Sequence, residues 1–199
     1  AMSFQTSIDW RDQGAGRKGT TTVVLLRHGE TEWNAENRFQ GQQDSKLTQQ
    51  GRQQAEACGR RLRDITFDAV ISSDLGRAHN TAKIVHQHLR GRPPLTTDPS
   101  CRERNYGAWE GKTREEAKAM CDNGKDVDDK YALDLAPHGG ETRGALQLRA
   151  QNFFISLLRQ HRGSTVLVVT HGAFMQEAIK GLLGIGERVR GRRGVPKTA

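Results

Sequence analysis

The sequence predicts an α/β fold in three layers, with a mostly parallel central sheet that is flanked by helices. Continuous apolar runs at residues 23–26 and 166–169 are typical of strands that are buried on both faces of a sheet. Strand-like segments alternate with segments of helical periodicity, which is typical of a helix-flanked parallel sheet. The 199 residues suit one domain. We place it at residues 21–185, between a disordered segment at residues 1–20 and a basic, disordered tail at residues 186–199.

The first half of the chain is expected to form two strands and two helices. The strand at residues 23–26 is followed by a polar stretch, and Thr48 then caps a helix. The small and apolar residues of this helix recur at i, i+3, i+4 and i+7 and form one inward stripe, made of Ala55, Cys58, Gly59 and Leu62. A short strand follows at residues 67–71. We expect Asp74 to cap the next helix, whose apolar face consists of Ala78, Ala82, Val85 and Leu89.

The second half of the chain continues the alternation. Residues 95–97 are expected to form an edge strand, and Thr113 and Glu116 have the spacing of a capping box that starts another helix. Residues 121–140 are polar and aspartate-rich, which indicates an exposed excursion. A helix at residues 141–159 and a last helix after the second apolar run are each expected to bury one face. These faces consist of Leu146, Ala150, Phe153, Phe154, Leu157 and Leu158, and of Phe174, Met175, Ala178, Ile179 and Leu182.

The formal net charge of +8 raises the question of nucleic-acid binding. Five basic residues and one acidic residue lie in residues 181–199, so half of the excess, a net +4, belongs to this Gly- and Arg-rich end. The aromatic residues are few and are not interleaved with the basic ones, which leaves no stacking platform for bases. We therefore expect no nucleic-acid partner, because an anionic substrate explains the remaining charge.

Cysteine usage and hydropathy bear on the cellular compartment. Cys58, Cys101 and Cys121 are odd in number and lack C-x-x-C spacing, which favours a reduced, intracellular protein over a disulfide framework. No segment approaches the roughly 20 apolar residues of a membrane span. The first residues contain no apolar region of the kind found in secretory signals. We expect a cytoplasmic protein without a membrane partner.

Two apolar runs end in the same way. The segments VVLLRHG at residues 23–29 and VLVVTHG at residues 166–172 each place a histidine and a glycine directly after a buried strand. Ligands collect beyond the carboxyl ends of parallel strands. If both strands lie in one sheet and point the same way, His28 and His171 emerge at the same edge. The flanking glycine permits close backbone approach there.

Two arginines accompany the histidines and indicate a phosphate pocket. Arg27 precedes His28 and carries a fork of donors that suits phosphate oxygens. Arg77 adds a second guanidinium in a first helical turn, where the helix dipole favours anions. A neutral imidazole in such a pocket can attack phosphorus and form a phosphohistidine. The guanidinium groups, with His171 if it is protonated, would hold the transferring phosphoryl group.

The leaving alkoxide needs a proton, and Glu103 is the best-placed acid in the sequence. It lies in the loop RERNYG, at residues 102–107, among cationic residues. Glu103 has to be protonated to donate, so we expect burial or the bound dianion to favour its protonated form. The alternative is that Glu103 pairs with Arg102 or Arg104 in a solvated charge run.

The chain resembles the histidine phosphatase superfamily, the phosphoglycerate mutase-like fold, in motifs that occur in the family's order. They are RHGETEWN, the arginine of SSDLGRAHNTA, the RERNYGAWEG loop, HGGET and VVTHGA. The ERNYG segment is similar to fructose-2,6-bisphosphatase-like members. The resemblance implies that residues 21–185 form a histidine phosphatase domain that works without a metal ion or cofactor. It further implies that His28 is the phosphorylated nucleophile, Glu103 the proton donor, and Arg27, Arg77 and His171 the phosphate pocket.

The resemblance also implies a set of substrate-binding residues, which are Asn34, Gln40, Gly41, Arg104, Tyr106 and Gly172. Asn34 and Gln40 can instead act only as turn formers. Arg77 can instead cover a helix surface with its aliphatic stem. One departure concerns the last helix, after which family members usually add a strand, whereas this chain ends in GERVRGRRGVPKTA. A homodimer is one way to cover the sheet edge so exposed.

The resemblance implies a metal-independent phosphatase that acts on a small phosphorylated metabolite, with a sugar bisphosphate favoured. The long insertion and paired arginines of the mutase branch have no counterpart here. A cofactor-dependent phosphoglycerate mutase and a phosphoprotein phosphatase remain alternatives. Two other classes also remain: a binding module that keeps the phosphate pocket without turnover, and a metal-dependent hydrolase. For the latter, no strand-end carboxylate accompanies either histidine.

Overall fold

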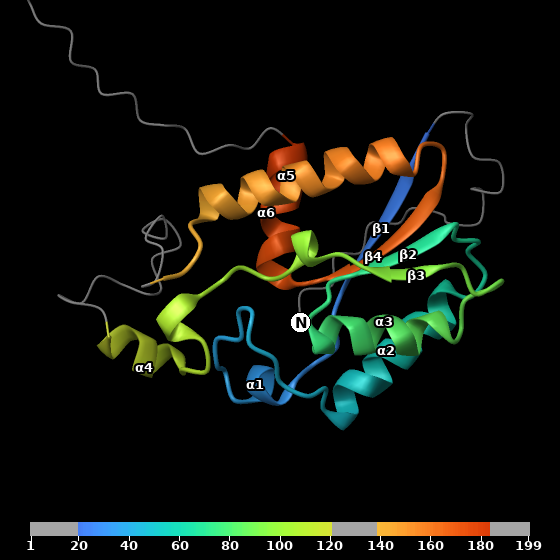
Figure 1. The fold of residues 1–199 in the computed structure, drawn as a ribbon. Helices are drawn as coiled ribbons and strands as arrows, with labels where there is room; N and C mark the ends of the chain where they lie inside the picture. The colour runs from blue at the N-terminus through green and yellow to red at the C-terminus, as the bar shows by residue number, and fades with distance from the viewer. Residues whose placement is uncertain (1–19, 121–138, 184–199) are drawn as a thin grey trace, which may run out of the picture.

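The computed structural model of the protein describes residues 20–120 and 139–183, in which strands and helices alternate along the chain (Figure 1). The expected disordered segment at residues 1–20, the polar excursion at residues 121–140 and the basic tail at residues 186–199 lie outside the described residues, apart from Thr20 and residues 139–140.

Four strands form one parallel sheet in the part of the chain that the structure describes. They are β1 (Thr22–Arg27), β2 (Ala69–Ser72), β3 (Leu95–Thr97) and β4 (Thr165–Thr170). Their order in the sheet is β1-β4-β2-β3, and every neighbouring pair is parallel. The predicted parallel sheet is therefore confirmed, with β3 at one edge. Because β4 lies between β1 and β2, the carboxyl ends of these strands lie next to one another.

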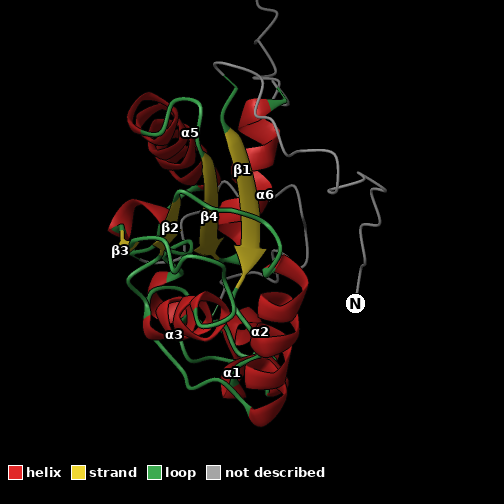
Figure 2. Ribbon diagram, turned by 90° about the vertical axis from the view of Figure 1, so that its right-hand side faces the viewer, coloured by secondary structure: helices red, strands yellow, loops and turns green. Residues whose placement is uncertain are grey.

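Helices cover both faces of the sheet and complete the three predicted layers, as Figures 1 and 2 show. α2 (Gln49–Leu62) and α3 (Gly76–His86) pack on one face, and α5 (Arg143–Gln160) and α6 (Gly172–Leu182) pack on the other. No helix among the described residues is long and apolar enough to cross a bilayer.

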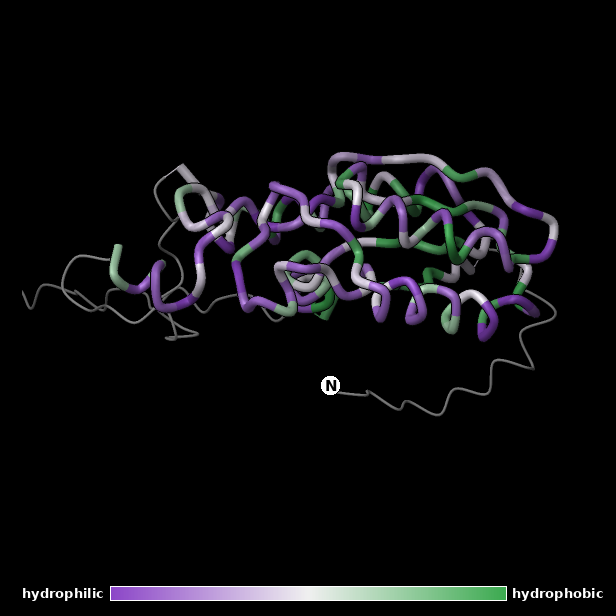
Figure 3. Tube along the Cα trace, turned by 90° about the horizontal axis from the view of Figure 1, so that it is seen from below, coloured by the Kyte–Doolittle hydropathy of each residue, from purple (hydrophilic) through white to green (hydrophobic). Residues whose placement is uncertain are grey.

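The central strand β4 shows why the sequence needs an unbroken apolar run. Val166 and Val168 belong to the core under α5 and α6, whereas Leu167 and Val169 belong to the core under α2 and α3. Successive strand side chains point to opposite faces, so a strand covered on both sides is apolar at every position. Figure 3 shows the hydrophobic segments gathered in the interior, while the outer helix turns are hydrophilic.

Helix starts follow the sequence signals at several places. The Thr48 side chain caps α2. Thr113 and Glu116 form the predicted capping box of α4 (Arg114–Ala119). α5 has Thr142 as its N-cap, so it begins slightly later than the sequence predicts.

The predicted cap of α3 is wrong. Leu75 is the N-cap residue, and its side chain makes no capping hydrogen bond. The Asp74 carboxylate instead accepts a hydrogen bond from Arg102 Nε at 2.7 Å and a second from Nη2. A charge-assisted fork binds a carboxylate more strongly than a neutral donor does. Asp74 therefore ties the connection between β2 and α3 to the loop that carries Glu103.

Parts of the predicted apolar helix faces are also wrong. Leu158 in α5 and Ile179 and Leu182 in α6 are 42%, 45% and 59% exposed. A helix buries only a stripe of its surface, and these positions lie at the margin of that stripe. Phe174, at the centre of the α6 stripe, is fully buried. Leu89 is buried as expected, but it lies beyond the end of α3.

Leu146 and Leu148 form a matched pair that tests the packing of α5. Leu146 is fully buried, whereas Leu148 is 59% exposed. We expect Leu146→Ala to lower the free energy of unfolding by about 2–5 kcal/mol, because it leaves a cavity in the core. Leu148→Ala should change it by less than about 0.5 kcal/mol. Urea denaturation of both variants measures the difference, and equal losses would contradict this packing.

Candidate active site

His28 and His171 lie side by side at the carboxyl edge of the sheet. Each directly follows a strand, and Arg27 of β1 is paired in register with Thr170 of β4. The His28 N–H continues the pairing and donates to the Thr170 carbonyl at 3.0 Å. The centroids of the two imidazole rings are 5.2 Å apart, with 58° between their planes. The structure thus brings together the two histidines that the sequence places at one edge.

A short hydrogen bond sets the tautomer of His28. The residue is buried, and its Nδ1 lies 2.7 Å from the Gly29 carbonyl oxygen. A carbonyl oxygen only accepts, so Nδ1 carries the proton and Nε2 keeps its lone pair. The Gly29 N–H in turn donates to Thr81 Oγ1 at 3.1 Å. A side chain at Gly29 would collide with the Gly51 carbonyl, so the glycine allows α2 to approach the end of β1.

Both imidazoles are neutral near pH 7. The pKa of His28 is lowered from 6.5 to about 3, first by burial and then by the charge of Arg77, while its hydrogen bond to Gly29 opposes the shift. The pKa of His171 is also lowered well below 6.5, chiefly by burial and then by Arg77. His28 therefore presents an unprotonated Nε2 at neutral pH. His171 becomes a cation only if a bound anion raises its pKa again.

Arg77 brings a buried guanidinium to the site. The residue is 1% exposed, so the alternative in which its stem covers a helix surface is wrong. Its Nη2 donates to the Gly41 carbonyl at 2.6 Å and its Nη1 to the Gln43 carbonyl at 2.7 Å. Nη1 also lies 3.2 Å from the Asp44 carboxylate. Burial lowers the pKa of Arg77, and the charges of Asp44 and Glu103 raise it.

Three buried nitrogen atoms of the site have no hydrogen-bond partner within the described residues. They are Nε of Arg77 and both ring nitrogens of His171. Buried polar atoms in native proteins are almost always hydrogen-bonded, so each exception needs an explanation. Arg77 Nε and the one protonated ring nitrogen of a neutral His171 are donors, and donors of these types suit the oxygens of an anion.

Arg27 and the start of α6 add positive potential. A Cβ on Gly172 would lie 3.5 Å from Arg27 Nε, so this exposed arginine lies against the first residue of α6. Its charge lowers the pKa of both His28 and His171. The N-terminus of an α-helix also favours negative charge. Two guanidinium groups and a helix start thus surround the histidine pair.

Glu103 lies against the same helix start. Its carboxylate accepts hydrogen bonds from the N–H groups of Arg104, Phe174 and Ala173 at 2.8, 3.1 and 3.2 Å. Glu103 is buried, and Arg102, one of its predicted ion-pair partners, binds a different carboxylate. The structure therefore places the predicted acid against the residues that follow His171 and Gly172, and not in a solvated charge run.

The predicted substrate-binding residues after β1 differ in how they relate to the site. Asn34 completes the capping box of α1 (Glu32–Ala35), which is the local role that the sequence left open. Gln40 is buried and accepts a hydrogen bond from Ser45 Oγ at 3.3 Å. Gly41 has a φ of 57°, which glycine adopts most readily, and its carbonyl binds the buried guanidinium. Substrate contact by Asn34 and Gln40 stays a prediction.

Arg104 and Tyr106 lie next to each other in the loop that carries the predicted acid. The Arg104 guanidinium carbon is 5.5 Å from the centroid of the Tyr106 ring. Arg104 is 2% exposed, and its Nε donates to the Glu141 carbonyl at 2.8 Å. Burial raises the pKa of Tyr106, so its hydroxyl stays neutral. Arg104 and Tyr106 follow Glu103 by one and three residues. Contact of the two side chains with a substrate stays a prediction.

Glu110, which is not among the predicted site residues, organises the loops around the site. The Glu110 carboxylate accepts hydrogen bonds from the N–H groups of Gln42, Gln43 and Tyr106 at 2.9, 3.0 and 3.0 Å. It thereby joins the loop before α2 to the loop that carries Glu103. The only signal in the sequence is an acid in a polar, glycine-containing turn, and that signal does not identify the partner.

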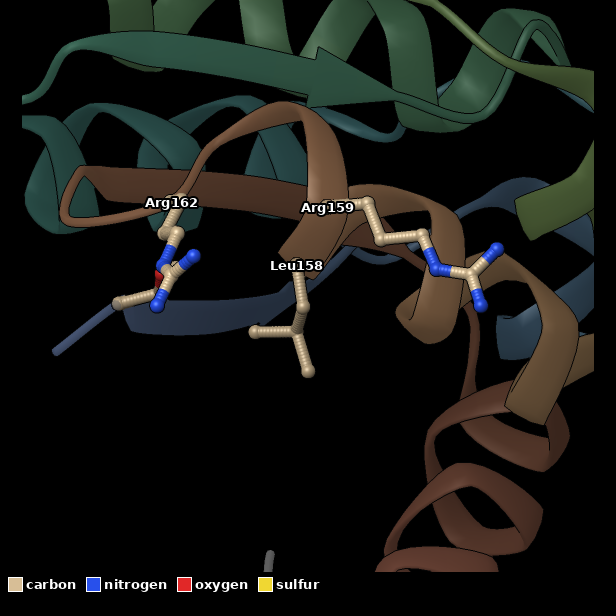
Figure 4. A pocket seen from close by; sticks show the side chains of 4 residues that line it. Leu158, Arg159 and Arg162 are labelled. Carbon is tan, nitrogen blue, oxygen red and sulfur yellow. The ribbon is translucent and has the colours of Figure 1, made fainter. Parts of the chain in front are cut away.

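A separate hollow lies at the opposite edge of the sheet (Figure 4). It is lined by Thr21, Leu158, Arg159 and Arg162. Thr21 precedes β1 and Arg162 precedes β4, whereas the histidines follow these strands. Within the ranges described, no three His, Cys, Asp or Glu side chains gather as metal ligands would. The histidine edge is therefore the candidate active site.

The family comparison covers all of this site. The sequence model of the histidine phosphatase superfamily (branch 1) matches residues 23–199, which include both histidines, Arg77 and Glu103. The chain belongs to the histidine phosphatase superfamily. The resemblance carried by RHGETEWN and VVTHGA is thereby confirmed.

Similar members of the superfamily include mutases and phosphatases. A 2,3-bisphosphoglycerate-dependent phosphoglycerate mutase of Brucella melitensis is 35% identical over 170 residues, which cover 82% of each chain. The solved structure of Bacillus stearothermophilus YhfR is 39% identical, with a TM-score of 0.73 over 83% of this chain and 81% of that one. A mycobacterial glucosyl-3-phosphoglycerate phosphatase, solved with VO3, is 29% identical, with a TM-score of 0.73 over 82% and 81%. Membership of this superfamily supports an enzyme.

The lowered histidine pKa values predict acid sensitivity. His28 has a pKa of about 3 in the folded protein and about 6.5 in the unfolded chain. The unfolded chain therefore binds more protons between these values, so the stability present above pH 6.5 is lost as the pH falls toward 3. We expect His28→Gln to reduce this pH dependence in urea denaturation. An unchanged dependence in His28→Gln would show that His28 is not held neutral by burial.

Proposed function

We propose that the protein is a metal-independent phosphomonoester hydrolase that works through a phosphohistidine at His28. Its substrate would be a small phosphorylated metabolite, with a sugar bisphosphate favoured. One observation carries this proposal: two neutral imidazoles with centroids 5.2 Å apart adjoin a buried guanidinium, and three of the nitrogens at this site lack partners among the described residues. Such a site offers a dianion both binding groups and a nucleophile. Superfamily membership supports the same reading.

In the first step, the lone pair of His28 Nε2 attacks phosphorus and the bond to the ester oxygen breaks. The hydrogen bond at Nδ1 leaves that lone pair free to react. Arg27, Arg77 and His171 would hold the other phosphoryl oxygens, and such positioning and charge stabilisation supply most of the catalysis in phosphoryl transfer. Glu103 would give a proton to the departing oxygen, so that an alcohol leaves.

In the second step, water attacks the phosphorus and the bond between phosphorus and His28 Nε2 breaks. Glu103, now a carboxylate, takes a proton from that water and is ready for the next turnover. Inorganic phosphate departs. His28 returns to the neutral tautomer because Nδ1 keeps its proton and its bond to the Gly29 carbonyl.

Arg104 and Tyr106 support a substrate that carries a second anionic group. The buried Arg104 lies beside the Tyr106 ring, in the same loop as Glu103. A guanidinium binds a second phosphate through a planar fork and would favour a bisphosphate over a monophosphate. The mycobacterial relative is named for glucosyl-3-phosphoglycerate, which supports the broader class of small phosphorylated metabolites.

A phosphoglycerate mutase is the second candidate, because the Brucella mutase is 35% identical over most of its length. Both functions share the phosphohistidine and differ in the acceptor, which is water in a phosphatase and a phosphoglycerate hydroxyl in a mutase. A long insertion does not separate the two, because the alignment with the Brucella mutase covers 82% of each chain. We favour water because a solved phosphatase, the mycobacterial glucosyl-3-phosphoglycerate phosphatase, is similar to this chain in structure. A cytoplasmic location, a homodimer and the absence of nucleic-acid and membrane partners also stay predictions.

A phosphate-release screen tests the proposed function. The panel comprises sugar bisphosphates, phosphoglycerates, nucleoside monophosphates and phosphopeptides, each with and without a strong chelator. We expect release from at least one small monoester, unchanged by the chelator, and less than about one part in a thousand of it in His28→Ala, since the nucleophile is gone. His161→Ala, at the end of α5 away from the site, is the matched control and should keep full activity.

Each other outcome has a definite meaning. Activity that is lost with the chelator contradicts metal independence. Transfer between positions of a phosphoglycerate, in place of release, favours the mutase, and release from phosphopeptides alone favours a phosphoprotein phosphatase. Binding of inorganic phosphate without turnover of any ester would identify a binding module. Full activity in His28→Ala would refute the phosphohistidine.

A further inference from the structure

We infer that Arg149 is a positioning residue for Glu103, an inference that rests on the proposed role of Glu103 as the acid. Arg149 lies in α5, outside the histidine pocket, and its side chain is 23% exposed. A guanidinium has five N–H groups. Those of Arg149 make hydrogen bonds to Glu141 and to three main-chain carbonyls of the loop that carries Glu103.

The three carbonyls belong to the segment that leads into Glu103. Arg149 Nη1 donates to the Ser100 and Arg102 carbonyls at 2.9 and 2.8 Å. Nη2 donates to the Glu103 carbonyl at 3.2 Å. Because the guanidinium is planar and its donors are rigidly spaced, these contacts define the path of the main chain relative to α5.

Glu141 fixes the main chain on the other side of Glu103. Its carboxylate accepts from Arg149 Nε at 2.9 Å and from Nη2 at 2.7 Å, which is a bidentate pair. Its main-chain N–H donates to the Asn105 carbonyl at 2.8 Å, and its carbonyl accepts from Arg104 Nε at 2.8 Å. Arg149 and Glu141 together therefore hold the chain before, at and after Glu103.

The same guanidinium reaches the group that orients the Glu103 carboxylate. It lies over the Phe174 ring, with 5.7 Å between the guanidinium carbon and the ring centroid. The Phe174 N–H donates to the Glu103 carboxylate at 3.1 Å. Arg149 thus contacts both the main chain of Glu103 and the residue whose N–H orients the Glu103 carboxylate.

Two phosphate esters separate positioning of the acid from general damage to the site. The alkoxide of an alkyl phosphate needs a proton to leave, whereas the phenoxide of 2,4-dinitrophenyl phosphate leaves without one. Arg149→Lys keeps the charge but loses the fork. We expect it to lower kcat/KM for an alkyl phosphate by about 10- to 100-fold, since a small misplacement of a catalytic acid is costly. The comparison uses kcat/KM because this ratio reports the steps up to departure of the leaving group and excludes hydrolysis of the phosphohistidine, in which Glu103 acts as a base for both esters. On the dinitrophenyl ester, the loss should stay below about threefold.

Matched variants keep this test decisive. Arg159→Lys lies in the same helix at an exposed position and should leave both rates unchanged. Glu141→Gln weakens the bidentate pair with a minimal change of shape, so it carries the test if Arg149→Lys does not fold, as judged by thermal unfolding. We expect it to show the same split between the two esters. Equal losses on both esters, or no loss on either, would overturn the inference.

Glu103→Gln distinguishes failure of this inference from failure of the proposed function. If Glu103 is the acid, Glu103→Gln shows the largest split between the two esters. A split in Glu103→Gln without one in Arg149→Lys and Glu141→Gln refutes only the positioning role. No split in Glu103→Gln refutes the acid itself.

Discussion

The parallel pairing of β1 with β4 is the constraint on which the site depends. Its register places Arg27 opposite Thr170, the last residues of the two strands. The residue that follows each of them is a histidine, so both imidazole rings lie beyond the carboxyl edge of the sheet. A slip of one residue would turn the side chains of one strand to the opposite face of the sheet. The close packing of the β4 side chains in the cores on both faces opposes that slip, because each side chain fills a particular space there. The same residues therefore stabilise the fold and align the pair.

Burial then determines the chemistry at that edge. An isolated buried guanidinium is unfavourable, and carbonyl groups together with the Asp44 carboxylate offset this cost for Arg77. For the imidazoles burial prevails, even over the hydrogen bond of His28 to the Gly29 carbonyl, and both remain neutral. After burial, the positive field that attracts a dianion also lowers the pKa of His28. Nε of Arg77 and both ring nitrogens of His171 are left without partners among the described residues, and a phosphoryl group would accept hydrogen bonds from those that carry a proton.

Local patterns in the sequence allowed the sheet, the helix layers and the meeting of His28 with His171 to be predicted, since apolar runs and strand ends are short-range signals. The partner of Asp74 could not be predicted, because Arg102 comes from a distant loop. The contacts of Glu110 and of Arg149 could not be predicted for the same reason. Long polar side chains that join segments far apart in the chain leave no periodic pattern, and such contacts hold the loops around the pair.

The most direct measurement is the site of phosphorylation during turnover. The protein would be mixed briefly with 2,4-dinitrophenyl phosphate and quenched in base, because phosphohistidine is labile in acid, and its peptides would then be analysed by mass spectrometry. The account predicts a phosphoryl group on His28, formed and lost at rates that match turnover. A phosphoryl group on another residue, or steady turnover in which His28 is never phosphorylated, would contradict it.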